Sequence, residues 1–273
     1  MTFGRNLVAL RRDSISIDGA PKKVIDMMRV AVLILASLVY CATAWSEVPK
    51  AEQVTFSAAD GVTVYADRYL QHSSPLTIIL MHQARANGRS EYAAIVPKLL
   101  ARGWSVLAVD LRSGGQLFGG YNRTVAEHPT AKSYCAAIPD AQAAIDYIKA
   151  HRPSDKVVLW GSSYSAALAI RLAATDGNAD AALAFSPASG KPMDGCRPES
   201  VFDDVAVPVL IFRPAREAEV ASVVAQIEAA KKSGHEVHIA ENGVHGSSML
   251  VEQRTGSDTS VEWDRVLRFL DSL

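Results

Sequence analysis

The chain has 273 residues, of which 49% are hydrophobic and 21% are charged, a composition that is typical of a folded globular protein and excludes a disordered one. Its formal net charge is −1, so no global electrostatic field draws it to nucleic acid or to anionic lipid. Because the sequence also has no basic stretch interleaved with aromatic residues, we expect no nucleic-acid partner.

The N-terminal region has the layout of a secretory signal peptide. Lys22 and Lys23 precede the apolar run at 29–40 (RVAVLILASLVY), and a small-x-small sequence follows at 42–44. A helix that spans a bilayer needs about 20 apolar residues, and this run is shorter. We therefore predict that 1–44 is a leader that is removed.

The mature protein is then predicted to comprise 45–273 as a single domain and to be exported, either to the periplasm or outside the cell. Met27 or Met28 is a more natural start than Met1, because a long leader ahead of the basic flank is unusual. The alternative is an uncleaved leader that acts as an anchor. Such an anchor would be the protein's only link to a membrane.

From about residue 52 onward, apolar strands alternate with helical segments. An antiparallel pair is expected at 54–56 and 62–69, around the turn dipeptide Asp60-Gly61. Further strands, most of them unbroken apolar runs typical of strands buried on both faces, are predicted at 76–81, 105–109, 157–160, 181–185, 207–212 and 237–240. Helical spacing is present at 92–100, 141–150, 166–174, 220–232 and 261–273.

This order of elements predicts an α/β fold. Strands separated by helices form βαβ units, so we expect a mostly parallel sheet with helices on both faces. The connection between the strands at 181–185 and 207–212 is too short for a large cap domain. Long connections at 113–138 and 187–205 follow the C-terminal ends of strands, which is the edge where open parallel sheets place their sites.

The most specific motif is a G-x-S-x-S sequence from Gly161 to Ser165, between a predicted strand and an alanine-rich helix. A nucleophile elbow needs small residues two before and two after its serine, because the turn is tight; Ser165 stands where glycine is commoner. Such a turn exposes the Ser163 hydroxyl and directs the backbone N–H of Tyr164 at a developing oxyanion. The alternative is a glycine-serine loop that caps a helix.

With this motif the chain resembles the α/β-hydrolase superfamily and, within it, the dienelactone-hydrolase-like serine esterases. The resemblance runs from about Val54 to the C-terminus, and four segments carry it: MHQA at 81–84, DLRSG at 110–114, GSSYS at 161–165 and VHG at 244–246. It implies a hydrolase that cleaves a carboxylic ester or related acyl bond of a small molecule. A Ser-His-acid triad would form an acyl-enzyme, with no cofactor.

The resemblance also implies the chain order serine, acid, histidine. His245 fits the base, because Ser163 needs a neighbouring base and imidazole titrates near neutrality. The acid should follow the strand at 207–212 by a few residues. Glu217 has this spacing, with Glu219 as the alternative, and both could instead be solvated glutamates at the start of a helix.

Residues at two other strand ends are assigned by the resemblance. His82 would order the oxyanion loop, and the backbone N–H of Ala84 would be the second oxyanion donor beside that of Tyr164. This loop lacks the glycine-rich HGGG form of many lipases, which argues against esters of bulky alcohols. Asp110 and Arg112 are expected to brace the loops beneath the site, and Asp110 is the next candidate for the acid.

Cysteine usage agrees with export. Cys41 lies in the leader, which leaves Cys135 and Cys196 in the mature chain. Both lie in the long connections that leave the same edge of the sheet, so we predict a disulfide between them, two unpaired cysteines being the alternative. Neither belongs to a CxxC or Cys/His cluster, so no metal site is predicted.

Other functions remain open at this point. A peptidase or an acyltransferase can be built on the same scaffold, and a binding protein can keep the fold without the chemistry. No GxGxxG, Walker loop or HExxH motif occurs, so the sequence does not support a nucleotide-binding or zinc-peptidase role. No pattern indicates an oligomeric state.

Overall fold

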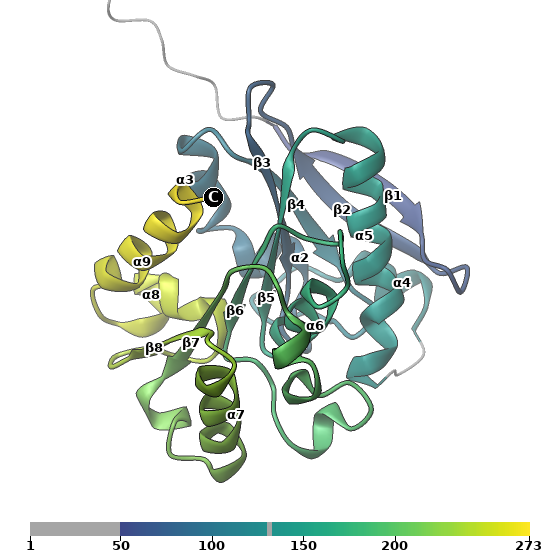
Figure 1. The fold of residues 1–273 in the computed structure, drawn as a ribbon. Coiled ribbons are helices and arrows are strands. Elements are labelled where there is room, and N and C mark those ends of the chain that lie inside the picture. Colours follow the sequence, from purple (N-terminus) through teal and green to yellow (C-terminus); the bar gives the residue numbers. More distant parts are fainter. Residues whose placement is uncertain (1–49, 130–132) are drawn as a thin grey trace, which may run out of the picture. The chain divides into compact units, whose positions relative to one another are not determined.

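Residues 50–129 and 133–273, the part of the chain that the computed structural model describes, form an eight-stranded sheet flanked by helices (Figure 1). The leader predicted at 1–44 lies outside these residues. Within them, no helix has the length and apolar character needed to cross a membrane.

The sheet has the order β1-β2-β4-β3-β5-β6-β7-β8. The strands β1 and β2 are antiparallel to each other, β2 is antiparallel to β4, and all remaining neighbours are parallel, as predicted. The bounds are β1 (Glu52–Ser57), β2 (Thr63–Tyr69), β3 (Leu76–Met81), β4 (Ser105–Asp110), β5 (Lys156–Ser162), β6 (Ala181–Phe185), β7 (Val209–Pro214) and β8 (Glu236–Ala240). The parallel strands end at one edge of the sheet, where the connections that follow them meet.

The helices predicted at 141–150, 166–174, 220–232 and 261–273 are present, two short helices at 123–127 and 252–255 were not predicted, and the helix predicted at 92–100 differs. The single helix expected at 92–100 is two helices, because Pro97 lies in the first turn of the second, where its missing N–H leaves no bond unmade. The helical bounds are α2 (Gly88–Tyr92), α3 (Val96–Ala101), α4 (Arg123–Glu127), α5 (Ile138–His151), α6 (Tyr164–Ala173), α7 (Ala221–Lys232), α8 (Glu252–Thr255) and α9 (Ser260–Asp271).

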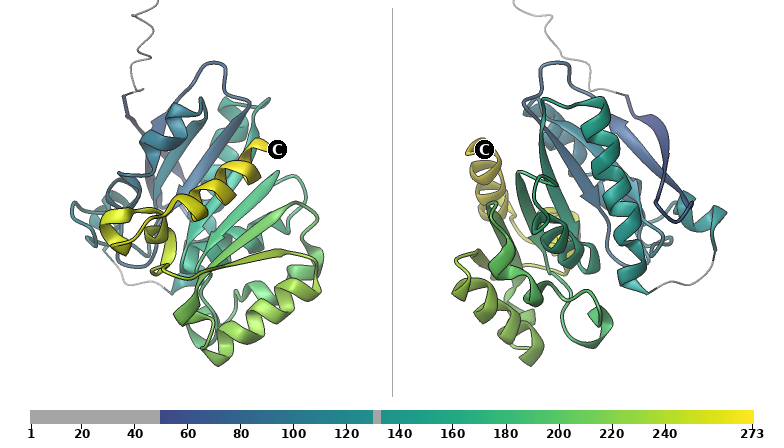
Figure 2. Two further views of the ribbon diagram at one scale, coloured as in Figure 1. Left: turned by 90° about the vertical axis from the view of Figure 1, so that its left-hand side faces the viewer. Right: turned by 45° about the vertical axis from the view of Figure 1, so that its right-hand side comes forward.

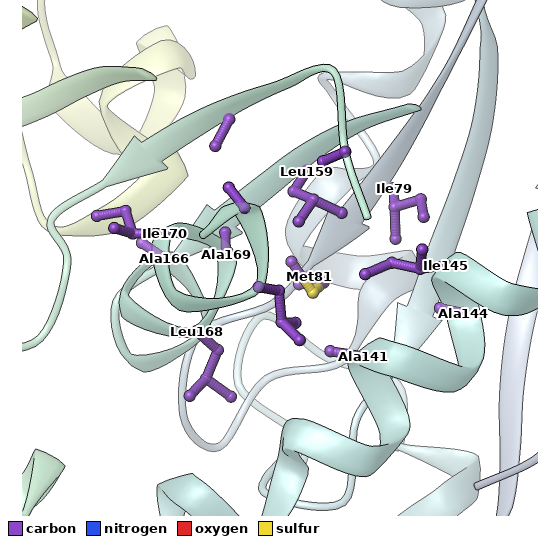
Figure 3. Close-up of a cluster of buried hydrophobic side chains, with 14 of the residues drawn as sticks. Ile79, Met81, Ala141, Ala144, Ile145, Leu159, Ala166, Leu168, Ala169 and Ile170 are labelled. Carbon is purple, nitrogen blue, oxygen red and sulfur yellow. The ribbon is translucent and has the colours of Figure 1, made fainter. Parts of the chain in front are cut away.

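Helices cover both faces of the sheet, as the two views in Figure 2 show. Alternate residues of a strand point to opposite faces, so Ile79 of β3 packs in the core beneath α5 and α6, whereas Leu80 packs in the core beneath α3 and α9. Both cores need apolar residues from the same strand, which explains its unbroken apolar run. Figure 3 shows the first core, where alanines of α5 and α6 let these helices approach the sheet closely.

The connection after β6 carries no cap domain. It is described throughout and contains three single 3-10 turns, η2 (Lys191–Met193), η3 (Pro198–Ser200) and η4 (Phe202–Asp204). The connection after β4 contains α4 and the 3-10 turn η1 (Tyr134–Ala137).

Candidate active site

Ser163 lies in a sharp turn between β5 and α6. Its backbone has φ 62° and ψ −120°, a conformation that residues other than glycine rarely adopt. A Cβ atom at Gly161 would lie 2.3 Å from the carbonyl oxygen of Ser165 and 2.4 Å from the backbone nitrogen of Ala166, so only glycine fits there. The turn has the strained geometry of a nucleophile elbow, with the Ser163 side chain at the end of the strand.

Ser165 has a structural task that glycine could not perform. Its buried hydroxyl accepts a hydrogen bond from the Ser162 backbone N–H at 2.9 Å and donates to the Met81 carbonyl at 2.7 Å. The first bond closes the elbow, and the second attaches it to the end of β3. This explains why serine stands at a position where glycine is commoner.

His245 and Glu217 are in direct contact. Glu217 ends the 3-10 turn η5 (Ala215–Glu217), immediately after β7, and His245 lies in the loop after β8. The imidazole Nδ1 is 2.6 Å from the carboxylate Oε1. Glu219, the alternative acid, is exposed to solvent instead.

Three groups surround the Glu217 carboxylate besides solvent. Burial raises its pKa, but hydrogen bonds from His245 and Ser186 and the positive charge of Arg213 outweigh burial and leave the pKa below its ordinary value. Arg213 is 2% exposed, and its Nη1 lies 3.3 Å from Oε2. The carboxylate is therefore ionised near neutral pH and oriented from both oxygens.

The loop that carries His245 is attached by two hydrogen bonds, one to the elbow and one to the residue after β6. The backbone N–H of Gly246 donates to the Ser186 hydroxyl, and that of Ser247 donates to the Ser162 hydroxyl, each at 3.0 Å. Within the described residues no hydrogen bond joins the Ser163 hydroxyl to His245. In unliganded enzymes this bond is often long and tightens only with substrate.

The loop after β3 has the order expected of an oxyanion loop. His82 is fully buried; its Nε2 accepts from the Leu111 backbone N–H at 2.9 Å, so its proton lies on Nδ1 and is donated to the Gln83 carbonyl at 2.8 Å. Burial lowers the pKa of His82, which keeps it neutral. Among the described residues, the backbone amides of Ala84 and Tyr164 have no hydrogen-bond partner and could serve an oxyanion.

Asp110 and Arg112 brace the neighbouring loops. Asp110 accepts from the Gly88 backbone N–H at 2.9 Å and from the Arg123 Nε at 2.7 Å. Arg112 binds the buried Asp140 through its Nε at 2.9 Å. Each charge is satisfied by these partners, and neither Asp110 nor Arg112 contacts His245.

Cys135 and Cys196 form a disulfide, with their Cα atoms 5.6 Å apart. The bond joins the connection after β4 to the connection after β6, as predicted. Tyr134, the neighbour of Cys135, stacks on Tyr164 with ring centroids 4.8 Å apart. The disulfide therefore holds a loop that packs against the residue after Ser163.

Several residues around the site were not predicted from the sequence. Arg213 lies just beyond the strand predicted at 207–212, and a charged residue there, four before a candidate acid, indicates a buried ion pair. Ser162 lies within the elbow motif but was assigned no role, and Glu91 and Ser186 contact the site from segments that no motif marks. In the described part of the chain, no cluster of three or more His, Cys, Asp or Glu residues could hold a metal ion.

Comparisons with known proteins agree with this arrangement. An esterase from Pyrococcus furiosus has the same fold, with a TM-score of 0.65 and 20% identity over 82% of this chain and 91% of that protein. For a dienelactone hydrolase from Anabaena variabilis the TM-score is 0.58 and the identity 15%, over 76% of this chain and 94% of that one. An acylaminoacyl peptidase from Pyrococcus horikoshii matches with a TM-score of 0.59 and 13% identity, over 86% of this chain but 43% of its own.

No curated protein matches the sequence. The model of the dienelactone hydrolase family does match, over residues 66–272. This range begins in β2, runs through the elbow, the acid and the histidine, and ends with α9. The chain belongs to the dienelactone hydrolase family, within the α/β-hydrolase superfamily.

Proposed function

We propose that the protein is an exported serine hydrolase that cleaves carboxylic esters of small molecules, with Ser163, His245 and Glu217 as its triad. Membership of the dienelactone hydrolase family indicates a hydrolase. The observation that carries the assignment of the triad is the 2.6 Å contact between His245 and Glu217. The loop that contains His245 is also hydrogen-bonded to the elbow of Ser163, through the Ser247 backbone N–H.

Each residue has a distinct part in the proposed reaction. Glu217 accepts a hydrogen bond from the Nδ1–H of His245, which keeps the proton on Nδ1 and leaves Nε2 free as a base for the Ser163 hydroxyl. Ser163 attacks the acyl carbon, its proton passes to His245, and the backbone amides of Ala84 and Tyr164 hold the oxyanion. The alcohol then leaves with the proton from His245, and water releases the acid from the acyl-enzyme by the same steps.

The openness of the site supports a small ester as substrate. The His245 side chain is 45% exposed, and the described connection after β6 contains only 3-10 turns above the elbow. A fold of this kind does not by itself fix the acyl group or the leaving group. A peptidase or an acyltransferase is therefore the outcome to expect if esters fail as substrates.

Export is part of the proposal, and two features support it. The sequence at 22–44 has the order of a signal peptide, and the Cys135–Cys196 disulfide suits an oxidising compartment. Sequencing the N-terminus of protein from the periplasmic fraction tests this. We expect a start close to Trp45 or Glu47, and an intact start at Met27 or Met28 would contradict cleavage.

The catalytic proposal is tested by labelling with a fluorophosphonate probe together with hydrolysis of p-nitrophenyl esters of graded chain length. Wild type should label and turn over, whereas Ser163→Ala should do neither. Ser189→Ala is the matched control, since this exposed serine on a neighbouring loop bonds only the Ser222 hydroxyl. A wild type that does not label would favour a binding protein, and labelling without esterase activity would favour a peptidase or acyltransferase.

A further inference from the structure

Glu91 is a fully buried carboxylate beneath the oxyanion loop. It lies in α2 and has no exposed surface. Its Oε2 accepts a hydrogen bond from the Gln83 backbone N–H at 2.7 Å. Gln83 directly precedes Ala84, whose amide is a proposed oxyanion donor. The carboxylate thus contacts the oxyanion loop one residue before the group that would touch the substrate.

The same side chain faces the elbow and the histidine loop. The Ser162 hydroxyl interacts with the Glu91 carboxylate and lowers its pKa. The oxygen of that hydroxyl accepts from the Ser247 backbone N–H at 3.0 Å, which leaves its own proton to donate. The Glu91 Oε1 atom is buried and has no hydrogen-bond partner among the described residues.

Arg254 joins the C-terminal part of the chain to the same place. Its Nη1 donates to the Glu91 carbonyl at 2.9 Å and to the Ser248 hydroxyl at 3.3 Å. Four segments therefore meet around the buried Glu91: α2, the oxyanion loop after β3, the elbow, and the loop that carries His245.

The groups around Glu91 lower its pKa by less than burial raises it. Burial raises the pKa of Glu91 to about 7, against the Ser162 hydroxyl, the Gln83 amide and the charges of Arg254 and His245, which lower it. The other titratable groups that it affects, Tyr92 and Tyr164, are buried with a pKa well above the ordinary value and stay neutral. A buried carboxylate that costs folding energy and lies at a reactive centre is a candidate for a functional role.

We propose that Glu91 is a positioning residue for the proposed ester hydrolysis: its carboxylate holds the Gln83 amide beside the Ser162 side chain, and so fixes the oxyanion loop next to the elbow. This inference rests on the proposed function. A small displacement of Gln83 moves the Ala84 donor, and catalysis is sensitive to displacements on the order of 1 Å. Protonation of Glu91 removes the negative charge that strengthens the hydrogen bond from the Gln83 amide, so the oxyanion loop is held most firmly when Glu91 is ionised.

Two variants separate the geometry of the side chain from its charge. Glu91→Gln keeps the size and an acceptor for the Gln83 amide but does not titrate, whereas Glu91→Leu keeps only the bulk. With p-nitrophenyl acetate at pH 8, we expect kcat to fall by more than about tenfold in Glu91→Leu and by less in Glu91→Gln, with KM little changed. Rates are referred to the fraction of protein that the fluorophosphonate probe labels, which removes the effect of unfolded protein.

The pH dependence of kcat separates the positioning role from a merely structural one, because a structural role would leave it unchanged. The acid limb of kcat in wild type should include a protonation near pH 7, the value to which burial raises the pKa of Glu91, and in Glu91→Gln this step should be absent. The NMR shift of the Gln83 backbone amide should titrate near neutral pH in wild type and in Ser163→Ala, and stay constant in Glu91→Gln. Glu252→Gln, which removes an exposed charge at the start of α8, is the matched control and should behave as wild type.

The outcomes distinguish this inference from the function on which it rests. An active wild type whose Glu91→Gln variant keeps the same kcat and the same acid limb overturns the inference alone, as does a Gln83 amide that ignores pH. A wild type that neither hydrolyses esters nor reacts with the probe overturns the proposed function and this inference with it. A step near pH 7 in the acid limb and a titrating Gln83 amide, both lost in Glu91→Gln, establish the positioning role.

Discussion

Arg213 reaches the proposed triad acid from inside the sheet: its Nη1 lies 3.3 Å from Oε2 of Glu217, whose other oxygen is bound to His245. The guanidinium is almost fully buried, and burial lowers its pKa to about 10, so it remains charged at neutral pH. It also bonds the Pro187 carbonyl and the Gln226 side chain. A fixed positive charge thus holds the acid from the side opposite the imidazole.

Replacing this charge should shift the pH dependence of catalysis. In Arg213→Met the burial of Glu217 is less opposed, so its pKa should rise and the acid limb of kcat/KM should move to higher pH. We also expect kcat at pH 8 to fall roughly tenfold, because the carboxylate loses one of its three orienting contacts. Arg216→Met, at an exposed neighbouring arginine, is the control. An unchanged acid limb in Arg213→Met would mean that Arg213 serves stability only.

The acid itself can be tested with a pair of matched glutamates. Glu217→Gln should lower turnover of p-nitrophenyl esters by more than about tenfold, because the amide cannot stabilise a protonated His245. Glu219→Gln should be near neutral, since this residue is exposed. The opposite ranking would assign the orienting role to Glu219, and small, equal losses would remove both from the triad.

Much of this site could be predicted from the sequence because its signals are local. Gly161 and Ser165 flank Ser163 at the spacing that a tight turn demands, and His245 lies next to a glycine after the last strand. The surroundings of Glu91 could not be predicted, because Ser162 and Arg254 come close to this residue only when distant parts of the chain meet. The division of the helix at 92–100 was also missed, because the periodicity of its apolar residues continues across the break before Pro97.

Glu91 should make stability depend on pH in a specific direction. Its pKa is raised from 4.5 to about 7 in the folded protein, so the folded state binds this proton more tightly than the unfolded state does. The stability from this group is complete below about pH 4.5 and is lost as the pH rises through about 7. Glu91→Gln should therefore be more stable than wild type at pH 8, by at most roughly 3 kcal/mol, and the gain should almost vanish at pH 4. Thermal unfolding at both pH values measures this, and an equal gain at both would contradict the charge effect.

Ser165 should matter for stability more than its size suggests. Ser165→Ala removes the buried hydroxyl that bonds the Ser162 amide and the Met81 carbonyl, and leaves both groups without this partner. We expect a loss of roughly 1–3 kcal/mol in the free energy of unfolding, measured by urea denaturation. Ser163→Ala is the control and should unfold like wild type, since its hydroxyl makes no hydrogen bond among the described residues. Equal stability of the two variants would contradict the structural task assigned to Ser165.

The disulfide should affect both stability and the site. Cys135 and Cys196 are separated by 61 positions in the chain, and closing a loop of this length stabilises a protein by roughly 4 kcal/mol in the chain-entropy model. The double variant Cys135→Ser, Cys196→Ser should therefore unfold at a lower urea concentration than wild type. Because Tyr134 beside the disulfide stacks on Tyr164, we also expect a lower rate of fluorophosphonate labelling at Ser163.

Reduction of the wild-type protein provides the control for the two serine substitutions. Dithiothreitol should reproduce both effects in wild type and change nothing in the double variant, since that variant has no bond to reduce. Thiol titration of unfolded, unreduced protein from the periplasmic fraction shows directly whether the bond forms. Two free thiols from Cys135 and Cys196 would contradict the pairing, whereas a paired protein whose labelling rate does not change on reduction would restrict the disulfide to a role in stability.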